Sequence, residues 1–492
     1  MSDSSKNLSL VIISSILFAI AFLPLGTGFL AYFAIVPLFF LLEKVTLTDA
    51  IFYGYLFGFL SNILSLFWIA NATFLGMVGA VLILALYNII FFVLYWLIRK
   101  KSISWAIVSS PFLWVAMEWI RSHGTLGFPW LNLSHTQASY PVIIQFAEFT
   151  GEMGVSFWVM LVNIEFYLLL RSKPNRKRII TLASLFILLF AVPIAWGIHR
   201  LHQNPPEDTG FRVALLQGNV DPYIKWTKSF QKENFRLYYS MIQEAGEKGA
   251  DLIILPETAT ASYLTHTRYE LREYRQLVDS IGIPVLFGSL DFKDTNRRRY
   301  YNAAFLMHPT RRTLDRYYKI QLVPFSEKTP LAETFPFLYD IDFGQGNFSS
   351  GTEKTIFSVD GYRFATLICF ESMFPELVRG FVRKNVDFIV NITNDGWFGN
   401  TPGPYQHLFA CPLRAVETRR PIVRCANTGI SAIIDPMGRI TSHTKYNEKT
   451  ILFANVPQKL KTTFYTRYGD IIGKLSLSIT GAFSIISLLT RV

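Results

Sequence analysis

The hexapeptide Leu367-Ile368-Cys369-Phe370-Glu371-Ser372 places a thiol at the end of an apolar run and an acid two residues later. The run Ala365–Cys369 predicts a buried strand, so Cys369 lies at the carboxyl end of that strand. Buried cysteines are commonly small core residues, and such a thiol becomes a nucleophile only beside a base or a cation. The hexapeptide alone therefore leaves Cys369 open between core packing and catalysis.

The region around this stretch, residues 207–460, alternates short β-branched runs with polar helical stretches. Gly, Pro, Asp or Asn bounds each run, which predicts buried strands joined by turns. The other predicted strands are Val213–Leu216, Leu252–Leu255, Val285–Gly288 and Phe388–Ile392. A block of this length can bury a core of its own, so we expect one α/β domain here.

Two further patterns place chemical groups beside apolar segments of the same region. Glu257 follows the second predicted strand in Leu255-Pro256-Glu257-Thr258, and Lys319 is enclosed by Tyr318 and Ile320. A carboxylate at a strand end can be held beside a reacting centre, and an amine in apolar surroundings can stabilise an oxyanion. Taken singly, Glu257 is more often an ordinary surface or capping residue, and Lys319 is more often a surface lysine on a strand.

Glu257, Lys319 and Cys369, in this order and each at a strand edge, resemble the Glu-Lys-Cys triad of the nitrilase superfamily. Supporting matches are Tyr301-Asn302-Ala303 before the lysine and Asn391-Ile392-Thr393-Asn394-Asp395 after the cysteine. The resemblance covers most of residues 211–455. It implies an αββα sandwich in which the three side chains converge in a pocket.

The first 200 residues consist of apolar runs with short polar breaks, which predicts a membrane domain. A span needs about 20 apolar residues, and the second run is short enough to leave a re-entrant segment open. Hydrophobic residues make up 51% of the chain and charged residues 17%, which excludes a disordered protein and argues against a wholly soluble enzyme. The predicted spans lie near Leu8–Pro24, Phe29–Leu42, Ala50–Ile69, Met77–Ile98, Ser104–Ile120, Val155–Leu170, Ile179–Gly197 and, as an eighth at the C-terminus, Ile471–Leu489.

The net charge of +12 lies partly in two basic loops, Arg99–Lys101 and Arg171–Arg178, which flank apolar runs. The loop Arg121–Gly154 has one arginine and no lysine. This distribution is typical of membrane topology and argues against a nucleic-acid partner. With the N-terminus in the cytoplasm, seven spans place residues 207–460 outside.

The whole arrangement resembles the apolipoprotein N-acyltransferase family: a multispan α-helical membrane domain, an extracytoplasmic α/β nitrilase-like αββα sandwich and a C-terminal span. Local matches are Gln217-Gly218-Asn219 followed by Trp226, Gly127-Phe128-Pro129-Trp130, Asn394-Asp395-Gly396-Trp397-Phe398 and Thr463–Asp470. The resemblance implies a multi-pass enzyme of the bacterial inner membrane with a periplasmic catalytic domain. Such an enzyme transfers an acyl chain from a phospholipid to the N-terminal α-amine of the diacylglyceryl-cysteine of a lipoprotein.

The resemblance also implies roles for single residues. Cys369 carries the acyl chain as a thioester, Glu257 is the base, and Lys319 stabilises the oxyanion, without a metal or cofactor. Four supporting or substrate-binding residues are implied as well: Trp226, Glu327, Phe370 and Glu371. In two places the chain departs from the family pattern, with Ser326 where glycine is usual and Phe370 where many members have tyrosine. Any role of that tyrosine hydroxyl does not carry over.

Two other classes of function remain open at this point: a membrane-anchored amidase that hydrolyses a small amide, and a transporter or scaffold whose outer domain only binds. Expected partners are the bilayer, a phospholipid donor and a diacylglyceryl lipoprotein, and nothing requires more than a monomer. We expect His407 to be a structural or exposed histidine, and residues 330–350 to form an aromatic-rich lid. The sequence leaves open the lipid headgroup and acyl length, the lipoproteins served, the pairing of Cys411 with Cys425, and the roles of Glu118 and Glu165.

Overall fold

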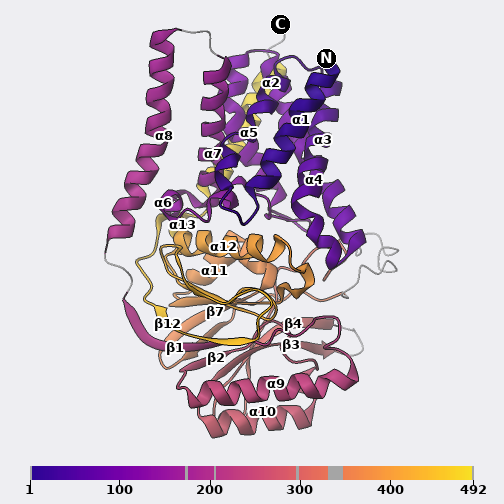
Figure 1. Cartoon of the computed structure of the whole chain (residues 1–492), viewed down its shortest axis with the longest axis vertical. Coiled ribbons are helices and arrows are strands. Elements are labelled where there is room, and N and C mark those ends of the chain that lie inside the picture. The colour runs from indigo at the N-terminus through magenta and orange to yellow at the C-terminus, as the bar shows by residue number, and fades with distance from the viewer. Residues whose placement is uncertain (1–2, 172–174, 204–206, 295–298, 331–346, 490–492) are drawn as a thin grey trace. The chain divides into compact units, whose positions relative to one another are not determined.

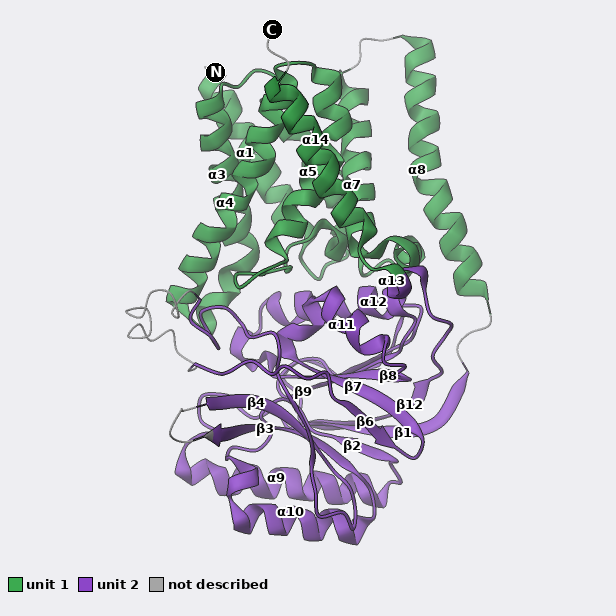
Figure 2. Cartoon of the chain, turned by 180° about the vertical axis from the view of Figure 1, so that it is seen from behind, with its two compact units in different colours: residues 1–203, 468–492 green, residues 204–467 purple. Residues whose placement is uncertain are grey.

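The computed structural model describes residues 3–171, 175–203, 207–294, 299–330 and 347–489. It divides into two compact units, one formed by residues 1–203 with 468–492 and the other by residues 204–467 (Figure 2). Most of the expected lid, including Phe335 and Phe337, lies outside the described residues.

The first unit is a bundle of apolar helices (Figure 1). Within the described ranges, seven helices are long and apolar enough to cross a membrane. Local capping sets their ends: Thr46, for example, forms a reciprocal capping box with Asp49 at the start of one of them. The long helices are α1 Asp3–Ala21, α3 Leu47–Leu66 with its 3-10 extension η2 Phe67–Asn71, α4 Phe74–Arg99, α5 Ile103–Arg121, α7 Ala147–Arg171, α8 Arg176–His202 and α14 Ile471–Leu489.

The predicted second span, Phe29–Leu42, differs from a single helix. It consists of the 3-10 helix η1, Gly28–Tyr32, and the seven-residue helix α2, Val36–Leu42. The side chain of Asn163 in α7 satisfies backbone groups at the break, since it accepts from the Ile35 N–H at 2.8 Å and donates to the Ala31 carbonyl at 2.8 Å. A helix can be interrupted inside an apolar bundle when neighbouring side chains supply such partners.

This broken segment nevertheless runs from one end of the bundle to the other. At its start, the Gly28 carbonyl accepts from Gln137, which lies in the segment after α5. At its finish, the Leu42 carbonyl accepts from Arg99 at 2.8 Å, and Arg99 ends α4 just before α5 begins. The two contacts therefore lie at opposite ends of α5, so the chain changes ends across η1 and α2.

Two basic residues of the predicted cytoplasmic loops meet at that second end. Arg171, which ends α7, lies 2.9 Å from Glu43, the residue after α2, and Arg99 also donates to the Val45 carbonyl at 2.8 Å. The ends of α2, α4 and α7 are thus neighbours within this unit. This is the grouping of basic loops that the predicted orientation requires.

The second unit is a four-layer αββα sandwich, which confirms the predicted fold class (Figure 2). Its first sheet has the order β12-β1-β2-β3-β4-β5 and its second the order β11-β10-β9-β8-β7-β6. The bounds in the first sheet are β1 Asp208–Gln217, β2 Leu252–Ile254, β3 Val285–Asp294, β4 Arg299–Met307, β5 Asp315–Tyr318 and β12 Thr450–Pro457. In the second they are β6 Ile356–Val359, β7 Tyr362–Ile368, β8 Phe388–Thr393, β9 Ile422–Ala426, β10 Ala432–Ile434 and β11 Ile440–His443.

Two helices cover the outer face of each sheet. Helices α9 (Lys228–Glu247) and α10 (Arg268–Ile281) lie on the first sheet, and α11 (Pro375–Val382) and α12 (Gly403–Thr418) lie on the second (Figures 1 and 2). The two inner faces pack against each other, as shown by Cys425 of β9, whose Sγ lies 3.2 Å from the Ile254 carbonyl of β2. All three cysteines are described and free, which answers the open question about pairing.

Sheet topology brings the candidate residues to one edge. Strands β1, β2 and β3 are parallel, as are β7, β8 and β9. Strand β5 pairs antiparallel with β4, which pairs antiparallel with β3, so β5 again runs the same way as β3. The carboxyl ends of β2, β5 and β7 therefore point in one direction within each sheet, and Glu257, Lys319 and Cys369 follow those ends.

Candidate active site

Glu257 is held on both carboxylate oxygens. Its Oε1 accepts from Asn302 Nδ2 at 2.8 Å and from Lys319 Nζ at 3.4 Å, and its Oε2 accepts from the Asn394 N–H at 3.0 Å. The side chain is buried. Partners on β4, after β5 and after β8 thus fix one carboxylate between the two sheets.

Lys319 is almost fully buried between two carboxylates. Its Nζ donates to Glu327 Oε1 at 2.9 Å and, over the longer distance of 3.4 Å, to Glu257 Oε1. Burial acts to lower the pKa of Lys319, but the carboxylates of Glu327 and Glu257 outweigh it and raise the pKa above its ordinary value. The lysine is therefore a fixed positive charge, which suits it to stabilise an anion rather than to move a proton.

Cys369 sits at a strained turn directly after β7. Its φ is +52°, in the left-handed region that non-glycine residues seldom occupy, and it opens the 3-10 helix Cys369–Met373. Burial and the Glu257 carboxylate raise the pKa of the Cys369 thiol, whereas the Lys319 ammonium opposes that shift. A thiol with a raised pKa keeps its proton, so this group needs a base before it can act as a nucleophile. Strain of this kind recurs at functional sites.

Glu327 and Glu371 hold the site in different ways. Glu327 bonds Lys319 directly and also accepts from the Val323 N–H at 3.0 Å, which closes the loop after the lysine. Glu371 instead accepts from three backbone N–H groups, those of Ile320, Gln321 and Ile368, and from the Tyr317 hydroxyl. It accepts from the Ile320 N–H at 2.7 Å on one oxygen and from the Ile368 N–H at 2.8 Å on the other. Glu371 therefore ties the chain after β5 to the end of β7.

Burial raises the pKa of Glu371 to about 7, although the hydrogen bonds from the Ile368 N–H and the Tyr317 hydroxyl act against the shift. We expect Glu371→Gln to lower the free energy of unfolding by about 1–3 kcal/mol, because its amide can no longer accept from all four donors. Activity should fall with it, since the Lys319 and Cys369 segments lose their common anchor. Denaturant unfolding measures the stability and a transfer assay measures the activity. The control is Glu376→Gln at the exposed start of α11. Equal effects of the two substitutions would contradict the prediction.

The two predicted aromatic residues differ in exposure. Trp226 lies in the turn between β1 and α9, with about a third of its surface exposed and its ring 5.2 Å from Lys225 Nζ. Phe370 is buried, and its ring meets Phe374 edge-on at 4.9 Å. The Phe370 ring therefore packs against another aromatic ring. Trp226 is thus accessible to solvent.

His407, Asp395 and Arg424 form a fully buried polar cluster next to Cys369. The sequence analysis did not predict this cluster. His407 is not exposed: its Nδ1 lies 2.8 Å from Asp395 Oδ1, and its Nε2 lies 3.1 Å from the Cys369 carbonyl oxygen. Arg424 pairs with the other oxygen of Asp395 at 2.7 Å. Burial of His407 and the Arg424 guanidinium lower the pKa of this histidine. The Asn394-Asp395 motif could have indicated the cluster, because it directly follows β8 at the same edge of the sheet as Cys369.

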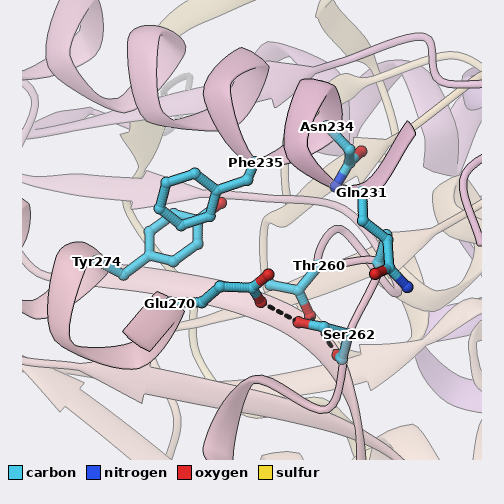
Figure 3. Close-up of a pocket in the computed structure, with 8 residues that line it drawn as sticks. Gln231, Asn234, Phe235, Thr260, Ser262, Glu270 and Tyr274 are labelled. Carbon is cyan, nitrogen blue, oxygen red and sulfur yellow. Dashed lines mark hydrogen bonds between the residues drawn. The ribbon is translucent and has the colours of Figure 1, made fainter. Parts of the chain in front are cut away.

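A small pocket lies beyond Glu257 along the chain, between α9, the segment 260–262 and α10 (Figure 3). None of Glu257, Lys319 and Cys369 lines it. Asn234 from α9 points into it and donates to the Ala259 carbonyl at 2.8 Å. The pocket is therefore separate from the candidate catalytic residues. The hydrogen bond from Asn234 supports the segment that follows Glu257. Its lining residues are Gln231, Asn234, Phe235, Thr260, Ala261, Ser262, Glu270 and Tyr274.

Two family models match the chain: carbon-nitrogen hydrolase over residues 212–464, and the apolipoprotein N-acyltransferase N-terminal domain over residues 14–165. A protein of Geobacter metallireducens named apolipoprotein N-acyltransferase is 35% identical, over 95% of this chain and 92% of that protein. The chain belongs to the apolipoprotein N-acyltransferase family. A relative of the same name from Chlorobaculum tepidum is 31% identical, over 98% of this chain and 97% of its own.

Membership of the apolipoprotein N-acyltransferase family makes the protein an acyltransferase of lipoprotein biosynthesis, and its apolar helices make it a multi-pass membrane protein. These findings confirm the predicted family and enzyme class.

Among solved structures, an amidase from Nesterenkonia sp. is 19% identical with a TM-score of 0.41, covering 54% of this chain and 95% of that one. A yeast protein of the nitrilase superfamily, Nit3 of Saccharomyces cerevisiae, is 17% identical with a TM-score of 0.39, covering 57% and 95%.

Proposed function

We propose that the protein transfers an acyl chain from a phospholipid to the N-terminal α-amine of a diacylglyceryl-cysteine lipoprotein, through a thioester on Cys369. One observation carries the proposal: the buried, hydrogen-bonded Glu257–Lys319–Glu327 group lies close enough to the strained Cys369 for Glu257 and Lys319 to shift the pKa of its thiol. These residues supply the base, the cation and the nucleophile that acyl transfer needs.

The first step forms the thioester. Glu257 takes the proton of the Cys369 thiol as the sulfur attacks the ester carbonyl of the phospholipid. The Lys319 ammonium stabilises the oxyanion of the tetrahedral intermediate. When the intermediate collapses, the C–O bond breaks, and the alkoxide of the lysophospholipid leaves with the proton that Glu257 held. A neutral thioester and an ionised Glu257 remain.

The second step uses the same groups. The lipoprotein amine attacks the thioester carbonyl, and Lys319 again faces the developing oxyanion. Glu257 accepts the proton of the amine, the C–S bond breaks, and the sulfur takes that proton back. An amide replaces an ester overall, and both substrates use one site in turn, which is ping-pong kinetics. All the groups belong to one chain, so a monomer suffices.

The supporting residues take defined roles in this proposal. Glu327 holds the Lys319 amine in place, Glu371 fixes the two strand ends, and Phe370 forms part of the apolar wall beside Cys369. Trp226, which is partly exposed in the turn before α9, contacts substrate. Residues 207–460 are the catalytic domain, and residues 1–200 with the helix 471–489 are the membrane part.

The proposal is tested by giving the purified enzyme a phospholipid with one labelled acyl chain and a diacylglyceryl lipopeptide. We expect the label on the peptide α-amine in a product one acyl group heavier, with one lysophospholipid released per product. Hydrolysis of small amides without transfer to the lipopeptide would favour the membrane-anchored amidase instead. An unreacted lipopeptide and intact phospholipid would favour a protein that only binds.

We further propose that the enzyme lies in the bacterial inner membrane with its catalytic domain in the periplasm. The positively charged ends of α4 and α7 support this orientation, since they gather at one end of the helical unit. The exposed positions Lys100 and Lys232 report the two sides. After Lys→Cys substitution, an impermeant maleimide should label position 232 in cells with a permeable outer membrane and position 100 only after lysis.

The native cysteines are buried, so they add little background to this labelling. Labelling of both positions from the same side would contradict the orientation.

A further inference from the structure

A buried lysine that the mechanism does not use lies beside the candidate base. Lys225 is only 2% exposed, and its Nζ donates to the Thr258 carbonyl at 3.0 Å and to Thr258 Oγ1 at 2.6 Å. Lysine side chains are almost never fully buried without a specific partner. Here the partner is the residue that directly follows Glu257, and it accepts both of these hydrogen bonds.

Thr258 has an unfavourable backbone conformation. Its φ is +45°, and a β-branched residue in the left-handed region is strained. The turn is also pressed against β3: a Cβ on Gly288 would lie 2.5 Å from Thr258 N and 2.6 Å from the Pro256 oxygen. The turn that carries Glu257 therefore cannot relax toward β3, and Lys225 bonds the strained residue through its own side chain and carbonyl.

Other supports of this segment act further from the base. Asn234 bonds the Ala259 carbonyl, and Thr260 Oγ1 donates to Ser289 Oγ at 2.7 Å; Asn234 and Thr260 are both drawn in Figure 3. Lys225 differs from them because it is charged and because its charge interacts with Glu257. Burial lowers the pKa of Lys225 to about 8, and the Glu257 carboxylate opposes that shift.

We propose that Lys225 is a positioning residue, which holds Thr258 in its left-handed conformation and thereby aims the Glu257 carboxylate for proton transfer from Cys369. Lys225 also belongs to the turn that carries Trp226, and its N–H donates to the Asp221 carbonyl at 3.2 Å. It thus links the turn that meets substrate to the base. The inference rests on the proposed function, because it assumes that Glu257 acts on the Cys369 thiol.

The test measures formation of the acyl-enzyme from phospholipid alone in a single turnover. Lys225→Met keeps most of the length of the side chain but removes both hydrogen bonds and the charge. We expect the rate to fall about 10–10²-fold with the phospholipid concentration for half-maximal rate unchanged, because a small misplacement of a catalytic group has effects of this order.

The decisive comparison uses glycine at position 258, since glycine adopts positive φ without strain. In a Thr258→Gly background, Lys225→Met should cost less than about threefold, because the strained conformation no longer needs the lysine. Thr258→Ala, which keeps the Cβ that strains a positive φ but only one of the two hydrogen bonds, gives a milder second variant that should be slower than wild type. An equal cost of Lys225→Met in both backgrounds would overturn the inference.

A matched control removes a different buried hydrogen bond from the same segment. Asn234→Ala loses the bond to Ala259 and should lower the melting temperature while keeping the acyl-enzyme rate within about twofold. A loss in Asn234→Ala as large as in Lys225→Met would show general loosening of the turn and overturn the inference. Absence of acyl-enzyme in the wild type would instead overturn the proposed function, so the two failures are distinguishable.

Discussion

The Cys369→Ala protein is expected to transfer no acyl chains and to form no covalent intermediate. The substitution removes the atom that carries the acyl group, whereas loss of a base or an oxyanion donor leaves the covalent route in place. In the proposed mechanism, Glu257 is the base and Lys319 the cation that act on the Cys369 thiol, and both charges influence its pKa. The expected effect is therefore the largest of any single substitution in the chain.

Mass spectrometry gives the direct measurement. Wild-type enzyme incubated with phospholipid alone should gain one acyl mass on the peptide that contains Cys369, labile to hydroxylamine and removed when a lipopeptide amine is added. The matched controls are Cys411→Ala in α12 and Cys425→Ala in β9, both of which should keep the adduct. Transfer by Cys369→Ala, or an adduct on either of the other two cysteines, would refute the assignment of the nucleophile.

Lys319→Met should reduce the rate of acyl transfer by about 10²–10³-fold, the typical cost of losing one oxyanion donor. It should also destabilise the fold by about 3–5 kcal/mol, because Glu257 and Glu327 stay buried without their cation. Single-turnover kinetics and denaturant unfolding measure the two effects separately.

The double substitution Lys319→Met with Glu327→Gln separates the charge balance from the chemistry. It removes one of the stranded carboxylates, so part of the lost stability should return while the rate stays low. If the rate recovered together with the stability, Lys319 would be a structural residue, and another group would have to stabilise the oxyanion.

Much of the second unit, residues 204–467, could be predicted because its strands are local patterns. The apolar runs Leu252–Leu255 and Phe388–Ile392 overlap β2 and β8, and their carboxyl ends position Glu257 and Asn394. A parallel strand buried on both faces leaves a continuous apolar run in the sequence. Residues that follow such runs can therefore be recognised from the amino-acid sequence alone.

The partners of those residues could not be predicted, because they come from distant parts of the chain. Lys225 bonds Thr258 from 33 residues away, and His407 contacts Cys369 from 38 residues away. Neither has a local pattern that separates it from an ordinary surface lysine or core histidine. The sequence indicates a supporting role for Glu371, but its contacts with backbone N–H groups depend on how two sheets meet.

The short helix pair of residues 28–42 has a practical consequence for anyone who fuses a reporter to this protein. A count restricted to membrane-length helices finds six before residue 204 among the described residues, an even number, and would assign the N-terminus and the second unit to the same compartment. The interrupted segment contributes one more crossing of the bundle and makes the number odd. A count of hydropathic helices misses this crossing because the segment is divided into two short helices, and Asn163 satisfies the backbone groups at the division.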